Sequence, residues 1–487
     1  MTLIPLEKKI LIGGRWVDSE SGDRYELRSP GDGSVIGTVP KCTRKDVQQA
    51  VEAAKEGKKA LKKMSLKARI HLLDKAMEIS RKRVEEAENI LCRESGKTIM
   101  ESRSEVGSAG YSWDNIRIAG ETAKLYRGQT LPNNTEDSNN KRIMVNQEPI
   151  DIVANISTFS YPSEMPNCSI PYALAIGTSV IVKPSRSTPF STTLLCEIME
   201  EAGFPAGSIN MITGIGDEVG DELVTHPDIE AVTFFGQKTT GEKITQKAGF
   251  KKQLMAIVSN NPLIVMNDAN INEAVKSAVG GAFAMAGQSP IATRKIMLHQ
   301  DIQKEFMNLF IEQTKALKLG DPLDEKTDVG PLNNETVLET ALKHLADAKE
   351  KGGTFITGGN NTKGYYIEPT IIDNATPDML VMQEGTPGPI VPVTTFSSMD
   401  EVIEMANSSC YGFQFGIFTS SLKNAFYLSE NSKTGAVYIN EATSCWEEMA
   451  AFGGVKCSGK GRMLSSWVLD HLTNTKMTMF DLDKTQN

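Results

Sequence analysis

Apolar residues between positions 45 and 125 recur about every 3.6 residues, which is the spacing of one face of an α-helix. The clearest examples are the segments VQQAVEAAKEGKKALKKM and ARIHLLDKAMEISRKRVEEAENILCRESG. A polar, Asn-rich stretch, PNNTEDSNNK, then interrupts the pattern and is typical of the tip of a hairpin or arm. Residues 45–125 are therefore expected to be helical and to be followed by an exposed turn.

Beyond this turn, short β-rich runs alternate with helical runs. IDIVANIS precedes a helix, TSVIVKPS precedes STTLLCEIMEEAGF, and AVTFFG precedes TTGEKITQKAG. This alternation predicts parallel strands joined by crossover helices. The pattern restarts at KIMLH and continues through GTFITGG, IVPVTTF, DEVIEMANSS and QFGIFTS, which indicates a second α/β unit. The final TKMTMFDLD alternates as an edge or arm strand does.

Length, charge and cysteine usage narrow the class of protein. A chain of 487 residues exceeds the size of one core, so two or three domains are expected. A net charge of -9 argues against a nucleic-acid partner. There is no signal-like N-terminus and no apolar run of roughly 18 residues, so we expect no membrane partner. Seven scattered cysteines without CxxC spacing indicate reduced thiols in the cytoplasm and no metal site.

Several ordered segments carry a resemblance to a known family. They are LIGGRWVD, VIVKPSRSTP, EEAGFPAGSINMITGIG, LGDPLDEKTDVGPL, GYYIEPTII, ANSSCYGFQFGIFTSSL and FGGVKCSGKGR. With these segments the chain resembles the aldehyde dehydrogenase superfamily across nearly its whole length. The similarity is to NAD(P)-dependent enzymes of the succinate-semialdehyde and lactaldehyde dehydrogenase kind.

The resemblance implies an α/β architecture, the aldehyde dehydrogenase fold. Residues 1–125 and 149–254 would form a Rossmann-like NAD(P)-binding domain, and residues 255–465 the catalytic-type α/β domain. Residues 126–148 and 466–487 would form a β oligomerisation arm. Because such an arm completes a neighbour's sheet, the resemblance implies a homo-oligomer, a dimer or a tetramer.

The reaction of the aldehyde dehydrogenases depends on residues at four motif positions, and this chain has a different residue at each of them. In the family a thiolate attacks the aldehyde, an Asn and a backbone N–H stabilise the oxyanion, and a Glu activates the hydrolytic water. The thiolate position falls on Pro290, which has no thiol and no backbone N–H. The Asn falls on Ser160 and the general base on Ala256. The Glu that holds the nicotinamide ribose falls on Gly385.

We therefore expect a degenerate family member without the catalytic Cys, a pseudoenzyme that is not an active aldehyde dehydrogenase. Its role would be structural, regulatory, or the binding of a ligand or protein partner in the remodelled cleft. The alternative is an oxidoreductase of the family that acts on an aldehyde with NAD(P) through a relocated thiol or altered chemistry. The candidate thiols are Cys168 and Cys445, the latter near Glu447. A conventional dehydrogenase is disfavoured because Pro290 stands at the thiol position.

The cofactor site that the resemblance implies is partly preserved, so NADP or NAD remains a candidate ligand. Lys183 matches the family's Lys at the adenosine ribose. Arg186 replaces an acidic residue of NAD-preferring members, and a guanidinium suits a 2′-phosphate. Gly214 opens a glycine turn for which structural packing is the favoured role. Gly236 is retained beside the pyrophosphate, where Gln237 replaces a smaller Ser.

Overall fold

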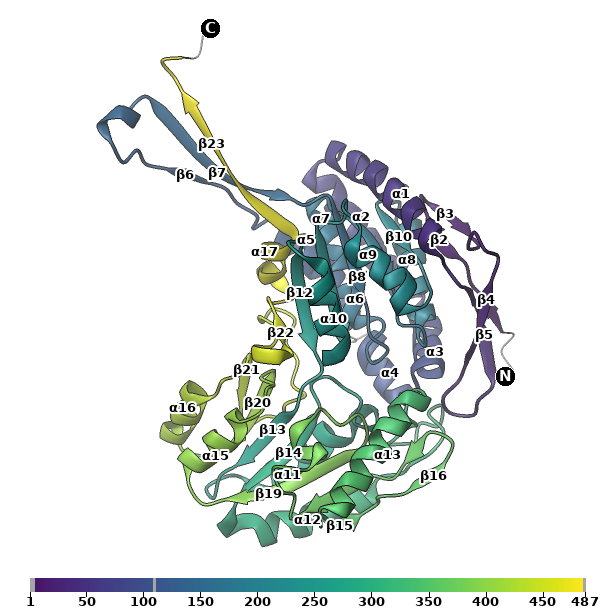
Figure 1. Cartoon of the computed structure of the whole chain (residues 1–487), viewed down its shortest axis with the longest axis vertical. Coiled ribbons are helices and arrows are strands. Elements are labelled where there is room, and N and C mark those ends of the chain that lie inside the picture. The colour runs from purple at the N-terminus through teal and green to yellow at the C-terminus, as the bar shows by residue number, and fades with distance from the viewer. Residues whose placement is uncertain (1–4, 108–110, 485–487) are drawn as a thin grey trace.

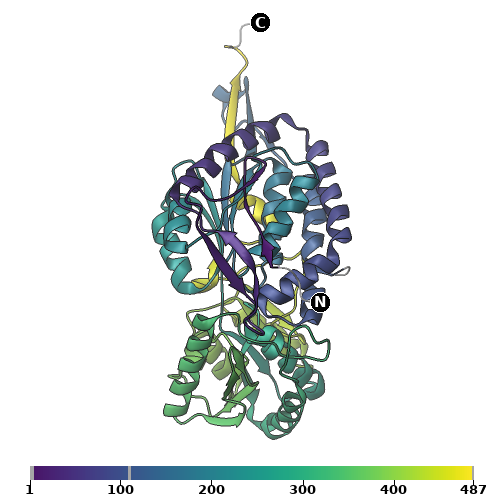
Figure 2. The same ribbon diagram turned by 90° about the vertical axis from the view of Figure 1, so that its right-hand side faces the viewer.

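The computed structural model of the chain describes residues 5–107 and 111–484. Two α/β bodies lie end to end, and a thin β arm projects from the larger one (Figure 1). Figure 2 shows the same two bodies and the arm from the side. Each body has its own large sheet, so the two-unit α/β organisation predicted from the strand–helix alternation is confirmed.

The sheet of the larger body has eight strands. In spatial order they are β22 (Gly459–Lys460), β12 (Lys252–Ile257), β11 (Ala231–Gly236), β8 (Ile152–Ile156), β9 (Ser179–Lys183), β10 (Ile209–Met211), β2 (Ile10–Ile12) and β3 (Arg15–Val17). The strands from β12 to β10 are parallel, whereas β22 and β2 join antiparallel. Among the parallel strands the chain enters at β8, moves outward through β9 and β10, and then returns to β11 on the other side of β8. This reversal is the strand order of a Rossmann-like domain.

Helices cover both faces of this sheet, and the helical region predicted for residues 45–125 is confirmed for its described part, since residues 108–110 lie outside the described residues. It contains α1 (Arg44–Lys63), α2 (Leu66–Lys82), α3 (Val84–Ser95), α4 (Ile99–Val106) and α5 (Tyr111–Ala123). The remaining helices of this body are α6 (Glu164–Asn167), α7 (Ile170–Ile176), α8 (Pro189–Glu201), α9 (Asp221–Thr225), α10 (Lys238–Ala248) and α17 (Leu469–Leu472). A small side sheet consists of β1 (Leu6–Glu7), β5 (Val35–Pro40) and β4 (Arg24–Arg28).

The smaller body is built on a seven-stranded sheet. Its strands, in spatial order, are β15 (Thr354–Thr357), β18 (Thr370–Asp373), β19 (Ile390–Phe396), β14 (Thr293–His299), β13 (Asn261–Val265), β20 (Gln414–Phe418) and β21 (Ala436–Ile439). Its helices are α11 (Ile271–Phe283), α12 (Gln303–Ala316), α13 (Glu335–Glu350), α14 (Leu380–Gln383), α15 (Met399–Asn407) and α16 (Leu422–Asn431). The short strands β16 (Asn361–Lys363) and β17 (Tyr366–Ile367) form a separate ribbon.

The arm joins two distant parts of the chain. It contains β6 (Gln129–Leu131), β7 (Lys141–Pro149) and β23 (Thr473–Asp481), and β23 pairs antiparallel with β7 along its full length. The turn predicted at PNNTEDSNNK lies between β6 and β7, and the predicted terminal strand is β23, so both predictions are confirmed. None of the helices in the described part of the chain has the length and apolar content to span a bilayer.

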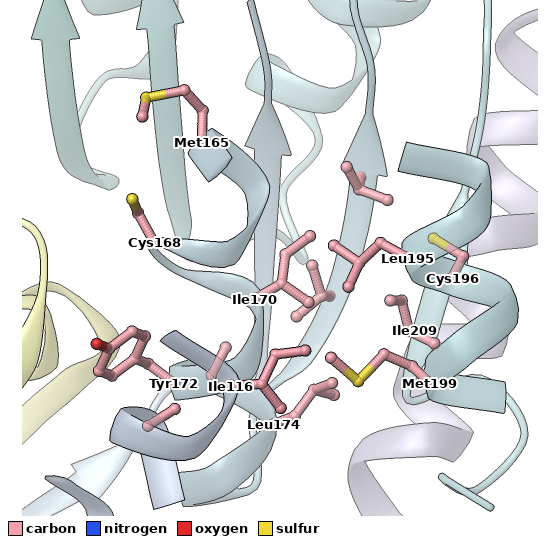
Figure 3. Packing of buried hydrophobic residues seen from close by; sticks show 14 of the residues in the cluster. Ile116, Met165, Cys168, Ile170, Tyr172, Leu174, Leu195, Cys196, Met199 and Ile209 are labelled. Atoms are coloured by element: carbon pink, nitrogen blue, oxygen red, sulfur yellow. The ribbon is translucent and has the colours of Figure 1, made fainter. Parts of the chain in front are cut away.

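The core of the larger body holds α6 and α7 against the sheet (Figure 3). Ile170 and Leu174 lie one helical turn apart on α7, and Leu195 and Met199 lie one turn apart on α8. All four side chains are buried and converge on one cluster, as the i, i+4 spacing of an apolar face requires. This packing fixes α6, whose residues border the candidate site.

Candidate active site

The parallel sheet of the larger body has a switch point between β8 and β11. Connections leave these neighbouring strands in opposite directions, so a crevice forms at their carboxyl ends. The residues that follow β8, from Ser157 to Ser160, and those that follow β11, Gly236 and Gln237, meet at this crevice. Ligands of open α/β sheets bind at such a point.

A cavity of about 400 Å³ lies at the β9 side of the crevice. Lys183, at the end of β9, lines it and is only 5% exposed. Within the described residues its Nζ donates one hydrogen bond, to the Pro184 carbonyl at 3.3 Å. Two of its three donors therefore remain for a ligand, and burial lowers the pKa of Lys183 to about 8. Arg186 is exposed at the rim, 5.4 Å from the centroid of the Tyr25 ring.

The glycines of the turn before α9 have two different roles. Gly216 and Gly220 line the cavity, and no atom lies within 4 Å of a Cβ built at Gly216. Gly214 does not line it: its φ is 142°, and a Cβ there would lie 2.9 Å from Cγ2 of Val219. Packing of the turn is therefore the contribution of Gly214. The carboxylates of Asp217 and Asp221 also border the cavity and are acceptors of the kind that sugar hydroxyls need.

A larger cavity, of about 700 Å³, adjoins the first and shares Thr158, Phe159, Gly236 and Gln237 with it. Ser160 and Gly385 line this larger cavity from opposite bodies. A Cβ at Gly385 would lie 2.8 Å from the Ser259 carbonyl oxygen, so a carboxylate side chain does not fit there.

The remaining family positions near the 700 Å³ cavity differ in their contact with it. Ala256 lies buried in β12 and lines none of these cavities, although Val258 lines the larger one. Glu384 lines the 700 Å³ cavity, with Oε2 3.4 Å from Nε2 of His344. An acceptor for a ligand hydroxyl is thus present one residue before Gly385.

The loop that precedes β14 is held in an unusual conformation. Met285 and Ala286 have φ values of 53° and 50°, in the left-handed region that only a few per cent of non-glycine residues occupy. Gly287 follows with φ 67°, and a Cβ there would lie 2.0 Å from the Gly388 carbonyl oxygen. The buried guanidinium of Arg294 donates to the carbonyls of Gly287, Ser289 and Thr386. These hydrogen bonds from a buried side chain hold the loop in its conformation.

Pro290 lies at the end of this loop and lines a third cavity, of about 220 Å³. The other polar groups around it include Lys97, Glu101, Tyr161 and Glu164. Lys97 forms a buried ion pair with Glu105, and its Nζ lies 4.0 Å from the centroid of the Tyr161 ring. The cavity is thus small, polar at one side, and bounded by Met165, Trp446 and Phe452 at the other.

Glu164 is the most perturbed acid of this third cavity. It is fully buried at the start of α6, and its Oε1 accepts hydrogen bonds from Asn115 Nδ2 at 2.8 Å and Cys168 Sγ at 3.4 Å. Burial, reinforced by the charge of Glu105, raises the pKa of Glu164 well above its usual range. Burial also raises the pKa of Tyr161. Burial therefore favours the protonated form of both groups, and in that form each can donate a hydrogen bond to an oxygen in the cavity.

The two candidate thiols do not line the cavities, although each adjoins residues that line the 220 Å³ cavity. Cys168 is fully buried at the end of α6, beside Met165 in Figure 3, and burial with the nearby Glu164 raises the pKa of its thiol well above the usual range. Cys445 is half-buried, and burial raises the pKa of its thiol too. Neither residue belongs to the lining of the three cavities. The thiolate form, which is the nucleophile, is disfavoured at both positions.

The structure also assigns three polar residues to the cleft that the sequence motifs did not mark. They are Glu164 and Lys97 at the 220 Å³ cavity and Lys295 at the 700 Å³ cavity. The one available signal was a charged residue inside an otherwise apolar run, as Lys295 is in TRKIMLH. Within the described residues, no group of three or more His, Cys, Asp or Glu side chains is placed to hold a metal ion.

Comparison with known proteins agrees with this geometry. The model of the aldehyde dehydrogenase family matches residues 16–478. The chain is 35% identical over 441 residues to the D-glyceraldehyde dehydrogenase (NADP(+)) of Picrophilus torridus, covering 89% of this chain and 88% of that one. It is 32% identical over 471 residues to the lactaldehyde dehydrogenase of Methanocaldococcus jannaschii, covering 96% and 99%. A solved betaine aldehyde dehydrogenase of Staphylococcus aureus, a point mutant in complex with NAD+, superposes with a TM-score of 0.94 at 28% identity and covers 98% of each chain.

These relatives contradict the expectation of a pseudoenzyme, because they are named as dehydrogenases of aldehydes. The expectation that aldehyde oxidation is lost and that the chain is not an enzyme was wrong because it weighed only the side chains that family motifs mark. Exchange of those side chains leaves the cavities open at the carboxyl edge of the sheet and beside Pro290, and polar groups such as Glu164 border them. The fold is that of the aldehyde dehydrogenases, and the chain belongs to the aldehyde dehydrogenase family.

Proposed function

We propose that the chain is an NAD(P)-linked oxidoreductase that acts on a short polar aldehyde by a route other than the family's thiol chemistry. The observation that carries this proposal is the set of three cavities that border the loops after β8 and before β14. The 400 Å³ cavity at Lys183 shares residues with the 700 Å³ cavity at Ser160. The 220 Å³ cavity at Pro290 shares no lining residue with these two, but it is lined by Tyr161, the residue after Ser160. A dinucleotide needs the two joined spaces, and a small aldehyde needs a third beside them.

The cofactor end of this set of cavities supports NAD(P) binding. The spare donors of Lys183 and the carboxylates of Asp217 and Asp221 fit an adenosine ribose, and Arg186 at the rim favours the 2′-phosphate of NADP. Gly236 and Gln237 would lie along the middle of the dinucleotide, with Glu384 near the second ribose. When bound, the nicotinamide ring supplies the acceptor or donor for a hydride.

The aldehyde end supports carbonyl polarisation without a thiol. The carboxyl of Glu164, whose pKa is raised by burial, and Tyr161 border the cavity of Pro290. A buried neutral acid can donate a hydrogen bond to the substrate oxygen and stabilise negative charge that develops there. In this proposal Glu164 and Tyr161 stabilise the oxyanion, as an Asn side chain and a backbone N–H do in the family. At about 220 Å³ the cavity admits only a short aldehyde.

Relatives named for D-glyceraldehyde and lactaldehyde suggest which short aldehydes to assay first. A relocated thiol at Cys168 or Cys445 is the other branch of the proposal, although burial disfavours both thiolates. The assignment of Pro290, Ser160 and Ala256 to the family's catalytic positions belongs to the same proposal.

The proposal also includes assembly of the chain into a homo-oligomer in the cytoplasm. The arm presents apolar side chains to solvent, among them Met477, Met479 and Phe480, each about half exposed. A protruding strand with such a surface is suited to pairing with a second copy of the chain.

Formation of reduced nucleotide at 340 nm tests the proposal. The purified chain is mixed with D-glyceraldehyde, lactaldehyde or succinate semialdehyde and with NADP or NAD. We expect aldehyde-dependent turnover that survives Cys168→Ser and Cys445→Ser. Loss of turnover in one Ser variant would support the relocated thiol. If calorimetry shows that cofactor binds but no aldehyde is oxidised, and no reduced nucleotide is consumed in the reverse direction, the proposed function is refuted.

A further inference from the structure

Lys295 is a buried lysine inside the central cleft. It lies near the start of β14 and is 2% exposed. Side chains alternate between the two faces of a strand, so Lys295 shares its face with Met297 rather than with Arg294 or Ile296. Both Lys295 and Met297 line the 700 Å³ cavity, together with Ser160 and Gly385. The amine therefore opens onto the 700 Å³ cavity, which is separate from the 220 Å³ cavity at Pro290.

No partner neutralises this amine within the described residues. Its Nζ takes part in no hydrogen bond and no ion pair, in contrast to Lys97, which is paired with Glu105. The titratable groups whose charge acts on its pKa are Lys456, which opposes a second positive charge, and Cys410, which has the opposite effect. A buried lysine without a carboxylate is rare because an unpaired ammonium is costly to desolvate.

The same surroundings favour the neutral amine. Burial, assisted by Lys456, lowers the pKa of Lys295 to about 8. Relative to an ordinary lysine with a pKa near 10.5, the neutral fraction at pH 7 rises by roughly 300-fold. Lys238 lines the same cavity, but its side chain is one-third exposed, its Nζ lies 3.8 Å from Glu242, and the nearby thiol of Cys410 raises its pKa. The cavity thus holds one lysine whose neutral, nucleophilic fraction is enlarged and one whose neutral fraction is not.

We infer that Lys295 is an aldehyde-accepting site that forms a reversible imine inside the cleft. The Nζ lone pair attacks the carbonyl carbon, and the C–N bond forms as the carbonyl oxygen takes up protons. That oxygen leaves as water with the two hydrogens of the amine, so that R–CHO and Lys–NH2 give R–CH=N–Lys and H2O. The step needs no oxidant and no cofactor. It therefore goes beyond the proposed oxidation and does not depend on it.

Reductive trapping of the wild-type chain tests this inference. The full-length protein is treated with propanal and cyanoborohydride at pH 7.5 without nucleotide, and peptide mass spectrometry then gives the labelling rate of each lysine. We expect Lys295 to be labelled at least tenfold faster than Lys238, which serves as the matched control. The Lys295-to-Lys238 ratio is expected to be largest below about pH 8 and to fall above it, because the Lys295 amine is by then largely neutral.

The variant Lys295→Arg keeps the charge and forms no imine, so total fast labelling is expected to disappear while Lys238 labels as before. The wild-type map alone decides the question if this variant fails to fold. Equal labelling rates at Lys295 and Lys238 would overturn the inference. Slow labelling of Lys295 that slows further with inorganic phosphate would also overturn it, because the amine would then be an anion site. Failure of aldehyde oxidation leaves this result untouched, since no cofactor is present.

Discussion

Replacement of Lys183 by Met is expected to stabilise the cofactor-free protein while weakening cofactor binding. Burial lowers the pKa of Lys183 from 10.5 to about 8. The difference of about 2.5 corresponds to about 3 kcal/mol at about 1.4 kcal/mol per pKa unit. That free energy measures how much the folded state disfavours the ammonium. A Met of similar length removes the charge, so the gain in unfolding free energy approaches this value at neutral pH.

The sign of the effect depends on pH. The folded pKa lies below the unfolded one, so between about pH 8 and 10.5 the unfolded chain binds more protons at this position. Wild-type stability therefore rises with pH through this window on account of Lys183. Below about pH 8 the penalty is fully present, and the advantage of Lys183→Met is constant. Above it the advantage shrinks toward zero near pH 10.5.

Thermal melting from pH 6.5 to 9.5, with and without NADP, measures both parts. Ligand that binds the folded state raises the melting temperature by mass action. Loss of one charge-assisted hydrogen bond is expected to weaken NADP binding by about 10- to 100-fold. Lys243 borders the same cavity but is exposed, so Lys243→Met is the control and is expected to leave cofactor-free stability nearly unchanged. A Lys183→Met protein that melts earlier at pH 7, or that responds to NADP as the wild type does, would refute the reasoning.

Three further predictions follow from the cleft and the arm. Glu164→Leu should lower kcat/KM for aldehyde by about 100- to 1,000-fold because it removes one donor to the substrate oxygen, whereas Glu164→Gln keeps a donor and should retain more activity; equal losses would count against that role. Gly287→Ala should destabilise the chain in urea unfolding, since its Cβ would lie 2.0 Å from the Gly388 carbonyl oxygen at a φ of 67°, and an unchanged midpoint would contradict this contact. Phe480→Glu on the exposed arm should lower the oligomer's mass in light scattering while leaving cofactor binding intact; an unaltered mass would show that the arm is not the interface.

Periodicity predicted most of the fold because the strands of both sheets are buried on both faces. Runs such as TSVIVKPS and QFGIFTS have consecutive apolar residues at their centres, VIV and FGIF, as a strand covered on both faces requires. The pairing of β23 with β7 was not predictable in register, because it joins segments more than 300 residues apart and follows from no local pattern.

The site was predicted less well, and the reason is visible in particular residues. Motif reasoning placed attention on Ser160 and Pro290, which do border cavities, and on Cys168, which does not. A sequence does not show how far a side chain is from water, and that distance decides the protonation of Glu164 and Lys295. The expectation of lost activity rested on the absence of the family's catalytic side chains. A sequence does not show which other polar groups tertiary packing brings to the cavities.

The buried guanidinium of Arg294 has a consequence for how the cleft can evolve. It clamps the carbonyls of Gly287 and Ser289, just before Pro290, to that of Thr386, next to Gly385. The loop at the 220 Å³ cavity and the Gly385 wall of the 700 Å³ cavity are thus one mechanical unit, and a change that shifts one displaces the other. Selection for a bulkier ligand beside Pro290 by moving this loop would reshape the 700 Å³ cavity in the same step. Independent tuning of the two cavities must therefore come from residues outside the clamp, such as Tyr161 and Glu164, which line the 220 Å³ cavity but not the 700 Å³ one.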